Sequence, residues 1–137
     1  MKNVGLFMPS AARIRVVRDE AAGLVVPVVC LQCDSPLCKN ACPVGAIVTN
    51  SFGVLTVNNE LCVGCGDCVT ACVYGGIVLE PVTRKAAKCD LCGGTPACVK
   101  ACEYDAIQLV EAHPESLQRR ALGFASAIRE YGLVREE

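Results

Sequence analysis

Tryptophan is absent from the 137-residue sequence, histidine occurs once, and aromatic residues make up 4% of the chain. The formal net charge is −1, and the sequence contains no long run of basic residues. A protein that binds nucleic acid usually presents a basic face, together with aromatic side chains where it binds single strands. These absences argue against a nucleic-acid-binding protein.

Long apolar segments are also missing, since no run reaches the roughly 18 residues that a membrane-spanning helix needs. Near the N-terminus, Pro9 and three arginines stand where a signal peptide would have its long apolar stretch; these are Arg13, Arg15 and Arg18. We therefore expect a cytoplasmic protein without a membrane span.

The motifs of several cofactor-dependent enzymes do not occur in the sequence. It has no C-x3-C-x2-C radical motif, no C-x-x-C-H haem site, no G-x-G-x-x-G and no P-loop. The single histidine, His113, lies at the predicted start of a helix, and that position explains it better than a role as ligand or base. We predict that this chain carries no catalytic residue.

Cysteine is what the sequence has in excess, with 12 residues. The central group has the spacing C-x2-C-x2-C-x3-C, typical of bacterial-type ferredoxin clusters, and consists of Cys62, Cys65, Cys68 and Cys72. Gly64 and Gly66 let this loop adopt backbone angles closed to other residues, so its first three cysteines can face one cluster. In two-cluster ferredoxins the fourth cysteine binds the other cluster, so the motif predicts a second set.

Two further quartets flank the central one. The upstream quartet precedes Pro43 and consists of Cys30, Cys33, Cys38 and Cys42. The downstream quartet consists of Cys89, Cys92, Cys98 and Cys102. The three quartets account for all 12 cysteines of the chain. Since a [4Fe–4S] cluster takes four thiolates, the sequence predicts three such clusters as cofactors, with every one of these cysteines a metal ligand.

A disulfide scaffold and a zinc site are the alternatives to iron–sulfur clusters. Repeated C-x2-C pairs in a reducing compartment indicate a metal rather than disulfides. The central motif places three thiolates within seven residues, a tighter grouping than the two-plus-two spacing of structural zinc. We therefore favour iron–sulfur clusters over both alternatives.

Each quartet is followed by a similar segment that ends in isoleucine, at Ile47, Ile77 and Ile107. This internal repeat predicts a cysteine loop, a short helix and a short strand in each unit. We expect residues 46–49 to pair with residues 54–57, and residues 77–79 to pair with a strand before Cys89. Residues 108–110 should end the third unit.

The segments on either side of the quartets differ from the repeat. Residues 13–17 alternate in polarity and residues 24–29 form an apolar run, which together predict a β hairpin. Apolar residues recur at helical spacing between Leu117 and Tyr131, so we predict a helix that covers the body, with partner docking as the alternative reading. The expected division is an N-terminal hairpin over 1–29, a cluster domain over 30–111 and a C-terminal helix over 112–137.

The three quartets resemble the second, third and fourth cluster motifs of ferredoxin-like electron-transfer subunits. That family includes the small iron–sulfur subunits beside molybdenum and tungsten oxidoreductases, formate dehydrogenases and hydrogenases. The resemblance covers about residues 5 to 110. The segment from Gly5 to Val17 is similar to its counterpart in relatives that serve tungsten enzymes of the aldehyde oxidoreductase type, including tungsten-dependent benzoyl-CoA reductase.

The resemblance implies an α+β fold of bacterial ferredoxin-like pseudo-repeats, with short β hairpins and short helices around the clusters. It also implies that the fourth cysteines cross over between clusters. The expected first cluster takes Cys30, Cys33, Cys38 and Cys72. The second takes Cys62, Cys65, Cys68 and Cys42. Relatives usually carry an additional cysteine motif upstream, and in them Cys102 would be expected to bind the cluster of that motif. The present sequence has no such motif, so the third cluster is expected to take Cys89, Cys92, Cys98 and Cys102.

The function implied is electron transfer rather than catalysis. We expect a subunit that connects a redox partner, such as ferredoxin, to the large catalytic subunit of an anaerobic oxidoreductase containing molybdenum or tungsten. The alternatives are a free-standing polyferredoxin that serves several enzymes, and a maturation or redox-sensing protein in which loss of a cluster is the signal. Co-purification with a large partner would separate a subunit from a free carrier.

Overall fold

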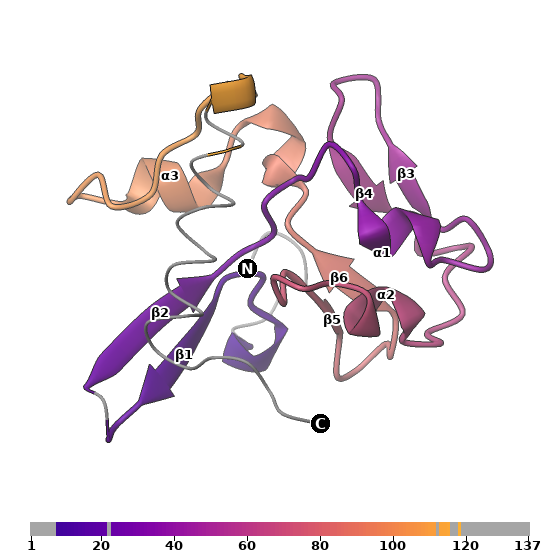
Figure 1. Cartoon of the computed structure of the whole chain (residues 1–137), viewed down its shortest axis with the longest axis horizontal. Coiled ribbons are helices and arrows are strands. Elements are labelled where there is room, and N and C mark those ends of the chain that lie inside the picture. The colour runs from indigo at the N-terminus through magenta and orange to yellow at the C-terminus, as the bar shows by residue number, and fades with distance from the viewer. Residues whose placement is uncertain (1–7, 22, 112, 116–117, 119–137) are drawn as a thin grey trace.

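The computed structural model describes residues 8–21, 23–111, 113–115 and 118. The elements in this part of the chain are short: three α-helices, two 3-10 helices and three two-stranded antiparallel sheets (Figure 1). They form a small α+β fold, in agreement with the predicted α+β class. The predicted C-terminal helix lies outside the described residues, apart from 113–115 and 118. The division into three segments stays a prediction.

The N-terminal hairpin joins β1 (Arg15–Asp19) to β2 (Leu24–Val28), after the 3-10 helix η1 (Pro9–Ala11). Two arginines connect this region to the rest of the molecule. The guanidinium of Arg13 forms an ion pair of 2.7 Å with the carboxylate of Asp90, and Nη2 of Arg15 donates a hydrogen bond to the carbonyl oxygen of Gly75. The hairpin is therefore held against loops that lie near the second and third quartets.

The second hairpin pairs β3 (Ile47–Thr49) with β4 (Leu55–Val57), as the sequence predicts. Its turn is stabilised by Asn50, whose side-chain oxygen accepts hydrogen bonds of 2.9 Å from the backbone N–H groups of Phe52 and Val54. Gly53 completes the turn with a φ of +75°, in the left-handed region that favours glycine.

The third hairpin pairs β5 (Ile77–Leu79) with β6 (Ala86–Lys88), which is the predicted strand before Cys89. The carboxylate of Glu80 accepts hydrogen bonds from the backbone N–H groups of Val82 and Thr83, at 3.2 and 2.6 Å. Hydrogen bonds from Thr83 lower the pKa of the Glu80 carboxyl. The turn thus retains an ionised carboxylate bound to its own backbone.

The three α-helices each carry the third cysteine of one quartet. They are α1 (Leu37–Asn40), α2 (Asp67–Thr70) and α3 (Ala97–Ala101), which contain Cys38, Cys68 and Cys98 respectively. Isolated helices of this length are not stable in water, so their position depends on tertiary contacts. In the structure α1 contacts α2 and β3, while α2 contacts β5.

The buried core of the described residues is small and includes cysteine side chains. Its apolar members are Ile47, Leu55, Ile77 and Ala86, which pack with Cys38 and Cys68. So few buried apolar side chains contribute little hydrophobic stabilisation, since burying each large one is worth about 1.5–3 kcal/mol. Two cysteines, Cys38 and Cys68, are part of this core.

One predicted strand is absent. Residues 108–110 lack regular secondary structure, although the sequence predicts that they end the third unit. The first two units each contain a second strand that pairs with the first, whereas no partner strand follows residues 108–110 within the described part of the chain. A strand without a partner leaves its backbone groups unpaired, which explains the difference.

Two glycines with similar backbone angles, Gly64 and Gly53, allow a matched test of the close packing at Gly64. A Cβ at Gly64, where φ is +73°, would overlap the carbonyl oxygen of Arg84, whereas a Cβ at Gly53, where φ is +75°, meets nothing within 4 Å. Gly53→Ala should cost about 1–2 kcal/mol through backbone strain alone. Gly64→Ala should cost clearly more and lower the iron content of the purified protein. Equal melting temperatures for the two variants would contradict the packing at Gly64.

Candidate metal centres

Four cysteines, Cys30, Cys33, Cys38 and Cys72, surround a cavity of about 270 Å³, called the first cavity below. Three of them belong to the upstream quartet, and the fourth belongs to the central one. The loop after β2 provides Cys30 and Cys33, α1 provides Cys38, and Cys72 lies just beyond the end of α2. Apolar side chains, among them Leu55, contribute to the wall.

A second pocket is lined by the complementary group, Cys42, Cys62, Cys65 and Cys68. Here three cysteines belong to the central quartet and one to the upstream quartet. The pocket has a volume of about 10 Å³. A cubic cluster needs more space than this, so the residues that line the pocket would have to move apart to hold one. No charged side chain is among the described residues that line this pocket.

The structure does not gather the third quartet around one cavity. Cys89 and Cys98 line a hollow of about 630 Å³, which they share with Cys30 and Cys33, but Cys92 and Cys102 are not among its lining residues.

The loop that carries Cys92 has an unusual backbone. Cys92 lies in the 3-10 helix η2 (Leu91–Gly94) with a φ of +53°, and its backbone N–H donates a hydrogen bond of 2.9 Å to the carboxylate of Asp90. Non-glycine residues are uncommon at this φ and often mark functional loops.

In each of the two cysteine groups that line the first cavity and the second pocket, the pKa of a buried thiol is shifted. Burial, followed by the charges of Cys42, Cys62 and Cys65, raises the pKa of the Cys68 thiol to about 11. Burial also raises the pKa of Cys38. A metal that binds these thiols must displace their protons, so its affinity depends on pH.

Backbone N–H groups point at the sulfurs of two fourth cysteines. The N–H groups of Ala46 and Ala106 donate to the Sγ atoms of Cys42 and Cys102, at 3.2 and 3.3 Å. Hydrogen bonds from Tyr104 and Ala106 lower the pKa of Cys102. Burial by itself would raise the pKa of Cys42, but backbone hydrogen bonds led by that of Ala46 outweigh it, so this pKa is also lowered. Such N–H···S hydrogen bonds help to set the potential of an iron–sulfur cluster.

The donor set of the first cavity fits a polynuclear cluster. Four thiolates surround the first cavity, and in a [4Fe–4S] cluster each iron takes one thiolate. Among the described residues, no three His, Cys, Asp or Glu side chains are grouped so that they could hold a single metal ion. The first cavity therefore has the donors and the apolar walls that a cluster requires.

Two residues near the first cavity were not indicated by the sequence. Lys88 lines this cavity although its charge would normally place it at the surface, and Gln32 bonds to the backbone of two neighbouring loops. The alternation along β6 offers a signal for Lys88, because Ala86 and Lys88 occupy the same buried face of that strand. No comparable pattern in the sequence marks Gln32.

A sequence model described as a 4Fe-4S dicluster domain matches residues 21–112 of the chain. Within the part of the chain that the structure describes, no helix has the length and apolar character to cross a membrane.

Several curated proteins are similar over shorter stretches. The polyferredoxin-like subunit of aliphatic sulfonate oxidoreductase from Pyrococcus furiosus is 41% identical over 70 residues, covering 50% of this chain and 40% of that protein. The B subunit of tetrathionate reductase from Salmonella typhimurium is 36% identical over 68 residues, covering 47% and 27%. The B chain of anaerobic dimethyl sulfoxide reductase from Haemophilus influenzae is 44% identical over 39 residues, covering 28% and 19%. The matches span less than half the length of these relatives.

Gly76 provides a test of the first cavity. A Cβ at this position would lie 2.6 Å from Cα and 2.9 Å from the backbone nitrogen of Cys30. Gly76→Ala should therefore displace Cys30, reduce the iron bound per chain and lower the melting temperature. Gly53→Ala is the control for iron content, because a Cβ at Gly53 would meet nothing within 4 Å. Its φ of +75° adds backbone strain, so the melting temperature of this control is not expected to stay unchanged. Iron content equal to that of the unmodified protein in Gly76→Ala would contradict the close approach.

Proposed function

Because the chain belongs to the 4Fe-4S dicluster domain family, we propose that it conducts electrons between a redox partner and the catalytic subunit of an oxidoreductase. The observation that supports this most directly is the reciprocal arrangement of the cysteines. Each of two pockets is lined by three cysteines of one quartet and the fourth cysteine of the other. When bound, [4Fe–4S] clusters supply one-electron transfer.

The proposed ligands of the first cluster are Cys30, Cys33, Cys38 and Cys72, and those of the second are Cys42, Cys62, Cys65 and Cys68. We propose a third cluster on Cys89, Cys92, Cys98 and Cys102. Its support is that these cysteines form a third motif, and that Cys89 and Cys98 share a hollow with Cys30 and Cys33. This proximity favours an arrangement in which the first cluster lies between the third and the second.

The role of the polypeptide is to hold the clusters and to exclude water. Leu55, Ile77 and Leu79 supply apolar walls to one or other pocket, and backbone N–H groups bond to the sulfurs. Both features tune the potential of a cluster without taking part in chemistry on a substrate. The proposed role is thus electron transfer and not catalysis.

The partner is proposed from the relatives. Those described above are named as a B chain, a B subunit and a polyferredoxin-like subunit of oxidoreductases, which favours a large redox enzyme as the partner of this chain. The resemblance of the cysteine motifs favours a molybdenum- or tungsten-containing enzyme, and the resemblance near the N-terminus favours tungsten. The reduced thiols that the clusters need favour the cytoplasm. A free polyferredoxin is the second candidate, and anoxic co-purification with a large subunit would distinguish the two.

The metal content tests the number and type of clusters. Three [4Fe–4S] clusters require about twelve irons and twelve sulfides per chain. We expect these amounts in protein purified without oxygen, by metal analysis and sulfide determination. About eight of each would support two clusters and not the third. Stoichiometric zinc with little iron would contradict the proposed function.

Two cysteine variants test the exchange of ligands. Cys72→Ala should damage the cluster of Cys30, Cys33 and Cys38 and leave the second cluster with four thiolates. Cys42→Ala should have the reverse effect, because it removes a ligand of the second cluster. Cys102→Ala is the control and should affect only the third cluster. EPR spectra that resolve the clusters distinguish this outcome from local ligation, in which the effects of Cys72→Ala and Cys42→Ala would be exchanged.

A further inference from the structure

A buried lysine lies beside the first cavity. Lys88 is the last residue of β6, is 3% exposed and lines the cavity that contains Cys30, Cys33, Cys38 and Cys72. Its ammonium donates hydrogen bonds to the carbonyl oxygens of Leu55 and Cys89, at 2.5 and 3.1 Å. Among the described residues it forms no ion pair with a carboxylate. A buried charge is costly unless an opposite charge compensates it, and thiolates of the cavity would do so.

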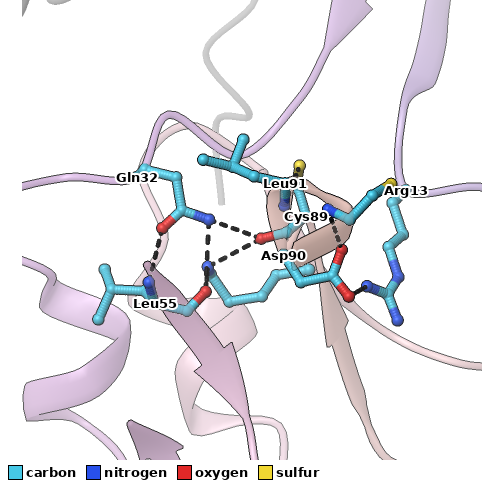
Figure 2. A network of polar contacts seen from close by, with 8 residues as sticks. Arg13, Gln32, Leu55, Cys89, Asp90 and Leu91 are labelled. Atoms are coloured by element: carbon cyan, nitrogen blue, oxygen red, sulfur yellow. Dashed lines mark hydrogen bonds and ion pairs between the residues drawn. The ribbon is translucent and has the colours of Figure 1, made fainter. Parts of the chain in front are cut away.

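Gln32 holds the same two carbonyl groups. Its side-chain nitrogen donates to the carbonyl oxygens of Cys89 and Leu55, at 2.7 and 3.3 Å, and its side-chain oxygen accepts from the N–H of Leu55 at 2.9 Å. Figure 2 shows the Gln32 carboxamide between Leu55 and Cys89. The network fixes the carbonyl oxygens to which Lys88 donates, so the ammonium has a defined position.

Lys88 lies beside cysteines of two different quartets. It lines the first cavity together with Cys38, and its ammonium donates a hydrogen bond of 3.1 Å to the carbonyl oxygen of Cys89. Asp34 also lines the first cavity, but it is exposed and its charge is screened by solvent. The second pocket provides an internal comparison, because none of the described residues that line it is charged.

We propose that Lys88 sets the potential of the first cluster, making it easier to reduce than the second. This inference rests on the proposed function, since it requires a cluster on Cys30, Cys33, Cys38 and Cys72. Reduction adds an electron, and a nearby cation stabilises the reduced cluster more than the oxidised one. Because Lys88 also lies beside Cys89, its charge would favour reduction of the proposed third cluster as well, and the second cluster is the one that lacks a buried cation among its described lining residues. Lys88 would thus influence where the electron resides through its charge, without itself being oxidised or reduced.

The main experiment is an EPR-monitored redox titration of the full chain, purified without oxygen. In Lys88→Gln the ratio of reduced to oxidised first cluster at a given potential should fall about tenfold, which is about 59 mV for a one-electron couple. The second cluster should shift much less. Lys88→Arg keeps the charge and should stay close to the unmodified protein. Lys39→Gln is the control, because Lys39 adjoins Cys38 in sequence but is exposed and screened.

Gln32→Ala separates the charge from the structural role. This variant loses the Gln32 bonds to Leu55 and Cys89, but Lys88 keeps its charge and its own two hydrogen bonds. It should therefore lower the melting temperature and change the first potential little. If Lys88→Gln lowers the melting temperature while every potential stays the same, the inference is wrong and the proposed function stands. Iron-free unmodified protein would contradict the proposed function itself.

A second measurement does not depend on whether Lys88→Gln retains its cluster. In the unmodified protein the first cluster should have a higher potential than the second, once Cys72→Ala and Cys42→Ala have assigned the EPR signals. A lower potential for the first cluster would overturn the inference, and a higher one would support it.

Discussion

The exchange of fourth cysteines is the constraint on which the rest of the fold depends. Cys72 lies with the upstream cysteines and Cys42 lies with the central ones, so under the proposed ligation each of these two clusters would take cysteines from both units. The helices that carry Cys38 and Cys68 have a single turn, and helices of that length have no independent stability. Metal–thiolate bonds in both pockets would join the two units covalently through the metal and would supply the stability that the small apolar core lacks.

The sequence predicted the parts of this arrangement that depend on local spacing. The pairing of residues 47–49 with 55–57, and of 77–79 with 86–88, reflects apolar strands on either side of turn residues. Among the described residues no strand pairs with residues 108–110, and this was not predicted, since pairing depends on which other segments lie alongside a strand in space. Lys88 and Gln32 were not indicated either, because their roles depend on the backbone of Leu55, which is far away in the sequence.

The third quartet shows why a repeated motif need not give a repeated site. Cys102 accepts an N–H hydrogen bond from Ala106, as Cys42 does from Ala46, so the local turn is the same in both units. The first two units exchange cysteines with each other, however, whereas the third has no such partner among the described residues. Its loop has a left-handed φ at Leu91, as the first two units have at Gln32 and Gly64, but it has another directly after it, at Cys92. The loop is also bound through Asp90 to Arg13 by an ion pair of 2.7 Å, and Figure 2 shows these two side chains together. The spacing of cysteines in the third motif therefore does not by itself determine how the structure groups them.

The two pockets lined by cysteines of both quartets have different electrostatic environments, although each contains four cysteines. Both are lined by four cysteines and apolar side chains, but among the described residues a buried ammonium group lines the first cavity and not the second pocket. Solvent screens an exposed charge, whereas a charge that is 3% exposed acts through a medium of lower dielectric constant. Two pockets related by a repeat thus acquire different electrostatics through a single residue on β6. In an electron-transfer chain that difference is functional, because unequal potentials decide where an electron resides.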